Sequence, residues 1–140
     1  KNISELPFDL VKGEELFKLH CSICHQFNIV GKLIGPQLDG IANRGRSRIL
    51  EDILYPSLNL DVAFRLRMIE LDTGELLTGL FKHVNGQQKV FIDIQGNEFS
   101  VDSADIVDES IIAQSLMPSS FDQILSNQDL SNLLSYLSTN

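Results

Sequence analysis

The chain has 140 residues, of which 43% are hydrophobic and 21% charged, a composition typical of one globular domain. Nineteen acidic against eleven basic residues give a net charge of −8, which argues against nucleic acid as a partner because phosphate binding needs a basic surface. No apolar run approaches the roughly 20 residues of a membrane-spanning segment, and the first ten residues lack the apolar centre of a signal peptide. We therefore expect a soluble chain whose targeting segment, if it is exported, has been removed.

The first 60 residues predict two helices separated by a loop. Leu10, Phe17 and the leucines between and after them share one helical face, and Asp9 is the candidate N-cap of a helix that ends in the pentapeptide CSICH at 21–25. Glycines punctuate residues 26–46, which predicts a loop. A short helix is expected from about Ser47, ending before Pro56 because proline excludes the helical conformation of the residue before it.

From Val62 the hydrophobic period changes to two, which predicts strands with turns at 72–75, 85–86 and 95–97. A small antiparallel sheet over about 62–110 follows from this pattern. A final helix is predicted from Ser126, with Asp129 completing a capping box, and leucines 130, 133, 134 and 137 form its apolar stripe. The predicted fold is mainly α, a single domain over 1–140 with a strand-rich insert.

Both cysteines of the chain lie in the pentapeptide 21–25, which has the C-x-x-C-H spacing of covalent c-type haem attachment. Positions i, i+3 and i+4 share a helical face, so Cys21 and Cys24 can form thioethers with the two vinyl groups of one haem. His25 then presents a ring nitrogen to the iron. This pattern predicts one covalent haem c.

Two other uses of the cysteines are structural zinc binding and thiol–disulfide exchange. A structural zinc site needs four cysteine or histidine ligands, and outside the motif only His20 and His83 remain. A thioredoxin-like C-x-x-C follows a strand in a βαβ unit, whereas this motif closes a predicted helix. Both alternatives are weaker than haem attachment.

Beyond the motif, the chain resembles the class I c-type cytochromes over nearly its whole length. The residues that carry the resemblance are Gly13-x-x-x-Phe17, Gly35-Pro36, Leu116-Met117-Pro118 and the segment LLSYL at 133–137. The resemblance implies a cytochrome c core, mainly α, and the small antiparallel β insertion before the distal methionine loop is where this chain departs from the simple members of the family. It also implies that Gly13 lets the first and last helices cross closely, with Phe17 and Tyr136 packed there, and that the Pro36 carbonyl accepts a hydrogen bond from His25.

The resemblance further suggests how the iron and the haem are held. His25 and Met117 are the expected axial ligands, because Met117 precedes a proline in a loop before the last helix. Met68, His20, His83 or an open site are the alternatives to Met117, since methionine is also common as core filler. Arg44, together with Arg46, is a candidate partner of the haem propionates, with a solvated loop arginine as the alternative.

A narrower resemblance concerns the haem-binding domain of large exported bacterial dehydrogenase-like proteins. It rests on GPQLDGIANR at 35–44, ILYPS at 53–57, Thr73-Gly74 and Thr78-Gly79. The expected function is one-electron transfer by a monohaem, periplasmic or otherwise exported cytochrome that is not an enzyme. Because the whole −8 falls in residues 61–140, we expect a basic redox partner. The alternatives are a ligand-binding haem sensor or peroxidase-like protein with an open or labile distal site, and a module of a larger dehydrogenase polypeptide.

Overall fold

The computed structural model describes residues 3–139 and divides the chain into two compact units. The helical unit is built from the chain up to Tyr55 and from Ser119 onward. The sheet unit comprises Pro56–Pro118. The chain thus leaves the helical unit once, forms the sheet unit, and returns.

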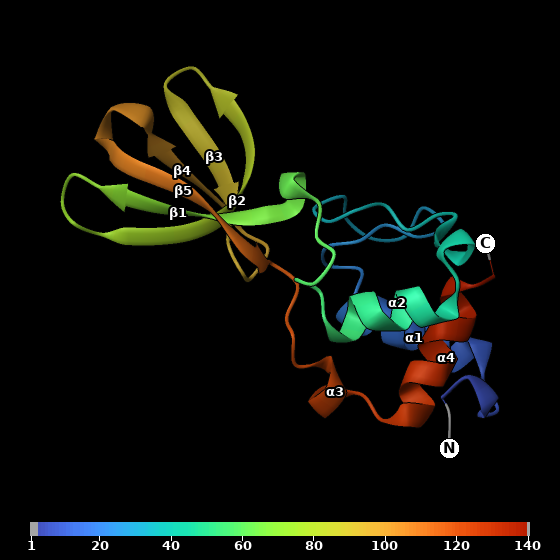
Figure 1. Cartoon of the computed structure of the whole chain (residues 1–140). Helices are drawn as coiled ribbons and strands as arrows, with labels where there is room; N and C mark the ends of the chain where they lie inside the picture. The colour runs from blue at the N-terminus through green and yellow to red at the C-terminus, as the bar shows by residue number, and fades with distance from the viewer. Residues whose placement is uncertain (1–2, 140) are drawn as a thin grey trace. The chain divides into compact units, whose positions relative to one another are not determined.

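The helical unit contains the helices α1 to α4 (Figure 1). In chain order its elements are η1 (Ile3–Glu5), α1 (Leu10–His20), η2 (Ile41–Arg44), α2 (Arg46–Leu54), α3 (Phe121–Ile124) and α4 (Asn127–Leu137), where η marks a 3₁₀ turn. Within residues 3–139, no helix has the length and apolar character needed to cross a membrane.

The three main helices begin and end where their capping residues predict. The Asp9 side chain accepts hydrogen bonds from the backbone N–H groups of Val11 and Lys12 and so caps α1. Ser126 and Asp129 form the predicted capping box of α4. Helix α2 ends at Leu54, ahead of Pro56. These predictions are confirmed.

Helices α1 and α4 pack against each other at Gly13. A Cβ atom on Gly13 would lie 2.2 Å from the Asn132 carbonyl oxygen and 2.7 Å from the Tyr136 Cβ. Only glycine allows the two backbones to come this close. Phe17 is fully buried, and its ring centroid lies 5.9 Å from that of Tyr136. The implied helix crossing and its aromatic packing are confirmed.

The sheet unit is a five-stranded antiparallel sheet in the order β4-β3-β2-β1-β5 (Figure 1). Its elements are η3 (Val62–Phe64), β1 (Arg65–Leu71), β2 (Leu76–Asn85), β3 (Gln88–Ile92), β4 (Glu98–Asp102), η4 (Ser103–Asp105) and β5 (Ile106–Ser115). Ile69, Phe91 and Val101 form its buried core. Gly79 leaves room for the Phe99 ring, because a Cβ there would lie 2.8 Å from its Cζ atom.

The sheet curls, so that its two edge strands approach each other. Strands β4 and β5 are the opposite edges of the hydrogen-bonded order, yet only the three residues of η4 join them. Four Cα steps span at most about 15 Å, whereas the edges of a flat five-stranded sheet lie about 19 Å apart. A flat sheet is therefore impossible, and the curl encloses the core.

The expectation of a mainly α fold is wrong. The structure contains 35% helix and 29% strand. The sequence pattern did not predict strands β4 and β5. Strand β5 continues to Ser115, past the expected end of the insert at 110. For β5 the reason lies in its register with β1, which shifts between Arg65 and Arg67 and again between Glu70 and Leu71. Such shifts break the alternation of buried and exposed residues by which a strand is recognised.

Candidate functional site

The pentapeptide 21–25 forms a tight turn directly after α1. The Cys21 N–H donates to the Phe17 carbonyl at 2.8 Å and so continues the last turn of the helix. The N–H groups of Cys24 and His25 both donate to the Cys21 carbonyl, at 3.1 and 2.9 Å. Both cysteines are free thiols. The motif therefore lies just beyond the helix and keeps its two thiols and its imidazole within one turn.

The His25 imidazole is oriented by a backbone carbonyl. Its Nδ1 lies 2.7 Å from the Pro36 oxygen. A carbonyl oxygen can only accept, so Nδ1 carries the proton and Nε2 keeps the lone pair that a metal ion needs. Burial lowers the pKa of His25 and so favours the neutral imidazole. The Pro36 hydrogen bond raises the pKa and offsets part of this effect. The contact implied by the family resemblance is present.

Two glycines allow the loop after the motif to lie close to His25. A Cβ on Gly35 would lie 2.8 Å from the His25 Cε1 and 3.2 Å from its Nδ1. Gly31 has φ +106°, and a Cβ there would lie 2.0 Å from the His25 carbonyl oxygen. In the sequence, Gly31 indicated only a loop, and Gly35 indicated a loop and was part of the family resemblance. The structure shows that Gly35 lies against the imidazole and that Gly31 lies against the backbone behind it.

The loop is anchored by Phe27, which the sequence analysis did not single out. Phe27 is fully buried, with its ring 5.9 Å from that of Phe17 and 5.2 Å from that of Tyr136. The Cys24 carbonyl accepts from the N–H groups of Ile34 and Gly35, at 3.0 and 2.7 Å. The only sequence signal was an aromatic residue two positions after His25 in a glycine-rich segment.

The surroundings of the thiols do not suit thiol–disulfide chemistry. Burial, with a smaller contribution from Cys24, raises the pKa of Cys21 to about 12. Burial also raises the pKa of Cys24, partly offset by Lys32. Reactive redox cysteines instead have a lowered pKa, because the thiolate is the nucleophile. The thioredoxin-like alternative thus loses support.

Zinc loses support for a separate reason. Among residues 3–139, no group of three or more His, Cys, Asp or Glu side chains is placed to hold a metal ion. A structural zinc site needs four such ligands. The motif therefore has one axial imidazole and two thiols, but no protein-only metal cage.

The arginines predicted to face the propionates have protein partners. Arg44 binds Asp52 of α2 through Nε at 2.9 Å and through Nη2 at 2.8 Å. Arg46 donates from Nη1 to the Ser135 hydroxyl of α4 at 3.2 Å. Propionate binding by Arg44 stays a prediction.

The structure assigns the two predicted axial ligands to different units. His25 belongs to the helical unit and Met117 to the end of the sheet unit, after β5. The Met117 N–H donates to the Ser115 hydroxyl at 3.0 Å, and its side chain is half-buried. Iron ligation by Met117 stays a prediction.

The alternatives to Met117 lie on regular elements. Met68 is an exposed residue of β1, His83 an exposed residue of β2, and His20 ends α1. The His20 ring meets the edge of Phe121, with centroids 6.1 Å apart.

The backbone turn, the oriented imidazole and the paired thiols can be compared with known families. Residues 10–58 match the Cytochrome c family model. The match spans α1, the motif, the glycine-rich loop and α2, and supports a c-type cytochrome domain with covalently bound haem c and a role in haem-based electron transfer. No curated protein matches the sequence. The narrower resemblance to dehydrogenase-like proteins is not supported by these comparisons.

The residues of the segment that matches the Cytochrome c family model fit haem c. Cys21 and Cys24 are free to form two thioethers, and Nε2 of His25 is available because Nδ1 is bound by Pro36. When bound, haem c supplies an iron that exchanges one electron at a time. Domains of this family are usually exported or periplasmic.

Proposed function

We propose that this protein is a monohaem electron carrier, not an enzyme, with His25 and Met117 as axial ligands. The observation that carries the proposal is the 2.7 Å contact between His25 Nδ1 and the Pro36 carbonyl. It fixes the tautomer that presents Nε2 to iron, and it raises the basicity of the ring. A second ligand from Met117 would fill the remaining axial position and favour the reduced state, as a soft thioether does.

The chain's own residues have simple roles in this scheme. Cys21 and Cys24 attach the macrocycle, His25 binds the iron, and Pro36 with Gly35 holds the imidazole in one orientation. Phe27, Phe17 and Tyr136 fix the loop to the crossing of α1 and α4. A rigid site suits electron transfer because little has to move when the iron changes its charge.

We also propose a basic redox partner in the periplasm or another exported compartment. The sheet unit holds ten acidic and four basic residues, a net charge of −6 of the total −8. Opposite charges speed the encounter of two proteins. A place in a larger dehydrogenase polypeptide remains a prediction, and the intact mass of the native product would test it.

The attachment chemistry is tested by Cys21→Ala combined with Cys24→Ala. We expect the double variant to lose all covalent haem, because the sequence contains no other cysteine. The measurement is acid-acetone extraction followed by a visible spectrum of the protein fraction. Haem that stays with the extracted double variant would refute the assignment.

The distal ligand is tested by Met117→Ala, with Met68→Ala as the matched control. Removing the axial thioether should open the iron, lower the reduction potential and let carbon monoxide bind to the reduced protein. Wild type and Met68→Ala should show little spectral change with carbon monoxide. If wild type binds it readily, the distal site is open or labile, as a ligand sensor requires. If only Met68→Ala opens the iron, Met68 is the ligand.

A further inference from the structure

The turn that begins two residues after His25 adopts a strained backbone. Asn28 and Ile29 both have positive φ, 51° and 60°. This conformation is rare for a β-branched residue because its Cβ crowds the backbone. The Ile29 side chain does not hold the turn in place, since 88% of it is exposed. The strain persists because neighbouring groups impose it.

Three contacts hold the turn. Phe27 and Val30 exchange backbone hydrogen bonds across it, at 2.9 and 3.1 Å. The Asp39 carboxylate accepts the Asn28 N–H at 2.7 Å. The buried Phe27 ring ties the start of the turn to α1 and α4. Asp39 is thus the side chain that reaches the turn from the Pro36 segment.

Asp39 lies on the same segment as the carbonyl that orients His25. The Asp39 N–H donates to the Gln37 side-chain oxygen at 2.7 Å. The Leu38 N–H donates to the Gln26 carbonyl at 2.9 Å. The bond from Leu38 continues the pairing in which the Cys24 carbonyl accepts the Gly35 N–H at 2.7 Å. Residues 24–28 and 35–39 are therefore paired side by side, and Asp39 closes the far end of that pairing.

We propose that Asp39 is a positioning residue for His25, whose carboxylate locks the strained turn to the Pro36 segment and so holds the Pro36 carbonyl against Nδ1. The inference rests on the proposed function, in which His25 binds the iron. A strong hydrogen bond to Nδ1 increases the electron donation of the ring and stabilises ferric iron. Loss of the Asp39 contact frees the segment and weakens that hydrogen bond. The equilibrium between ferric and ferrous iron then shifts toward the ferrous state.

The test uses Asp39→Ala in the haem-loaded chain. Loss of a direct hydrogen-bond partner of a metal-bound histidine changes affinity or activity about 10- to 100-fold. Asp39 acts one step further away, so we expect roughly a threefold increase in the ratio of reduced to oxidised protein at a fixed applied potential. The hyperfine-shifted His25 ring protons in the NMR spectrum of the ferric protein should move as well. A merely structural residue would leave those resonances in place.

Three further variants separate position from charge. Asp39→Asn keeps an oxygen acceptor for the Asn28 N–H and should resemble wild type. Asp39→Glu keeps the charge but misplaces the oxygen, so it should shift in the direction of Asp39→Ala, and it carries the test if the alanine variant does not fold. Glu15→Ala removes an equal charge from an exposed position of α1 and should change nothing.

The outcomes are distinct. If the ratio of reduced to oxidised protein is unchanged in both Asp39→Ala and Asp39→Glu, the proposed role of Asp39 is wrong. The role is also wrong if Asp39→Asn changes this ratio as much as Asp39→Ala does. In either case the wild-type His25 resonances remain hyperfine-shifted and the proposed function stands. A wild-type spectrum without hyperfine-shifted His25 protons overturns the proposed function and this inference together.

Discussion

The helical unit and the sheet unit are stabilised in different ways. In the helical unit, a few residues that are close in sequence determine the important features, such as the Asp9 cap, the Ser126–Asp129 capping box and the 21–25 turn. In the sheet unit, the main contacts join residues that are far apart in sequence. Ile69, Phe91 and Val101 meet in its core, and Glu109 meets Arg67 and Lys89.

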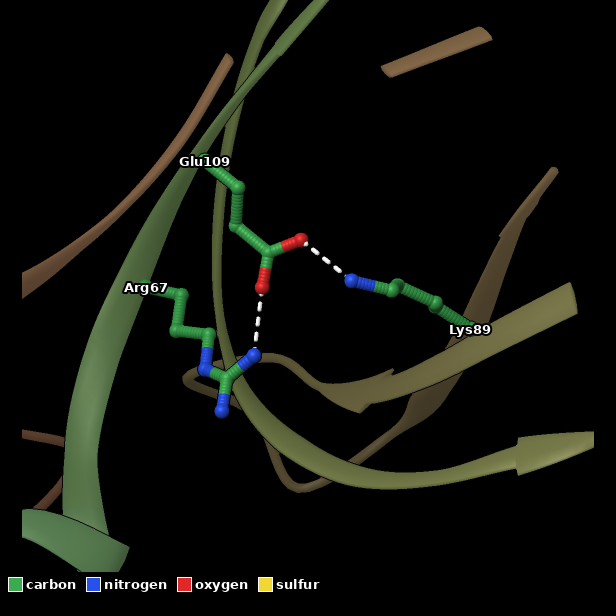
Figure 2. A network of polar contacts seen from close by, with 3 residues as sticks. All are labelled: Arg67, Lys89 and Glu109. Carbon is green, nitrogen blue, oxygen red and sulfur yellow. Dashed lines mark hydrogen bonds and ion pairs between the residues drawn. The ribbon is translucent and has the colours of Figure 1, made fainter. Parts of the chain in front are cut away.

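Glu109 shows how the sheet unit depends on contacts between strands. Its carboxylate lies between the side chains of Arg67 from β1 and Lys89 from β3, and binds one with each oxygen (Figure 2). The Arg67 guanidinium also lies 4.4 Å from the centroid of the Phe81 ring. Because β3 and β5 are not neighbours in the sheet order, this network depends on the curl of the sheet. The comparison teaches that the caps and the 21–25 turn of the helical unit depend on neighbouring residues, whereas the closure of the sheet unit depends on contacts between distant strands.

The largest expected effect comes from Phe91→Ala in the sheet core. Phe91 is fully buried, stacks on Phe99 at 5.5 Å and meets the edge of Phe81 at 5.7 Å. We expect a loss of about 3–5 kcal/mol in the free energy of opening of the sheet, because a large cavity replaces the ring. Hydrogen exchange of the strand amides measures this loss. Ile94→Ala, at a position 74% exposed, is the control. Equal effects would mean that the core does not hold the sheet.

A smaller loss is expected from Glu109→Gln, which removes the charge between Arg67 and Lys89. Leaving half-buried cations unpaired should cost about 1–3 kcal/mol. Burial alone would raise the pKa of Glu109, but hydrogen bonds from Lys89 and Arg67 outweigh this effect and hold the pKa below its ordinary value. The carboxylate therefore stabilises the fold above about pH 4.5, and this contribution is lost as the pH falls through the lowered pKa.

Denaturation curves from pH 7 to pH 3 measure this effect. The free energy of unfolding of wild type should exceed that of Glu109→Gln at pH 7, and this difference should disappear toward pH 3. Glu70→Gln changes an exposed glutamate of β1 and should leave the curve unaltered. A constant difference between wild type and Glu109→Gln down to pH 3 would contradict a role for the ionised carboxylate.

The smallest expected effect concerns the charge of the sheet unit. Reversing Asp105 and Asp108 to lysine should slow electron transfer to a cationic oxidant such as tris(phenanthroline)cobalt(III) by about threefold at low salt. The effect should shrink as the Debye length falls from about 10 Å at 0.1 M salt to about 3 Å at 1 M. Replacing Glu15 of α1 with lysine should slow electron transfer to this oxidant less. Stopped-flow rates against this oxidant and against anionic ferricyanide give the comparison. Equal losses of rate from both regions would show that the sheet unit does not steer the encounter more than the helical unit does.

The candidate site could be predicted in part. The three residues that we propose bind haem lie within one pentapeptide, so their spacing alone indicated the chemistry of Cys21, Cys24 and His25. The Pro36 contact came only through the family resemblance. The packing of Gly35 on the imidazole and of Phe27 on Phe17 could not be predicted, because each depends on how the loop folds back.

The sequence by itself determined the haem-attachment motif, the helix caps and the first hairpins, since each depends on residues within a few positions of one another. Tertiary structure alone decided the closure of the sheet through η4, the strand β5 with its shifted register, and the network around Glu109. The same holds for the strained turn that Asp39 ties to the Pro36 segment. The physical reason is that hydrogen bonds and packing between distant segments form only after the chain has folded back. The spacing of neighbouring residues in the sequence therefore cannot predict them.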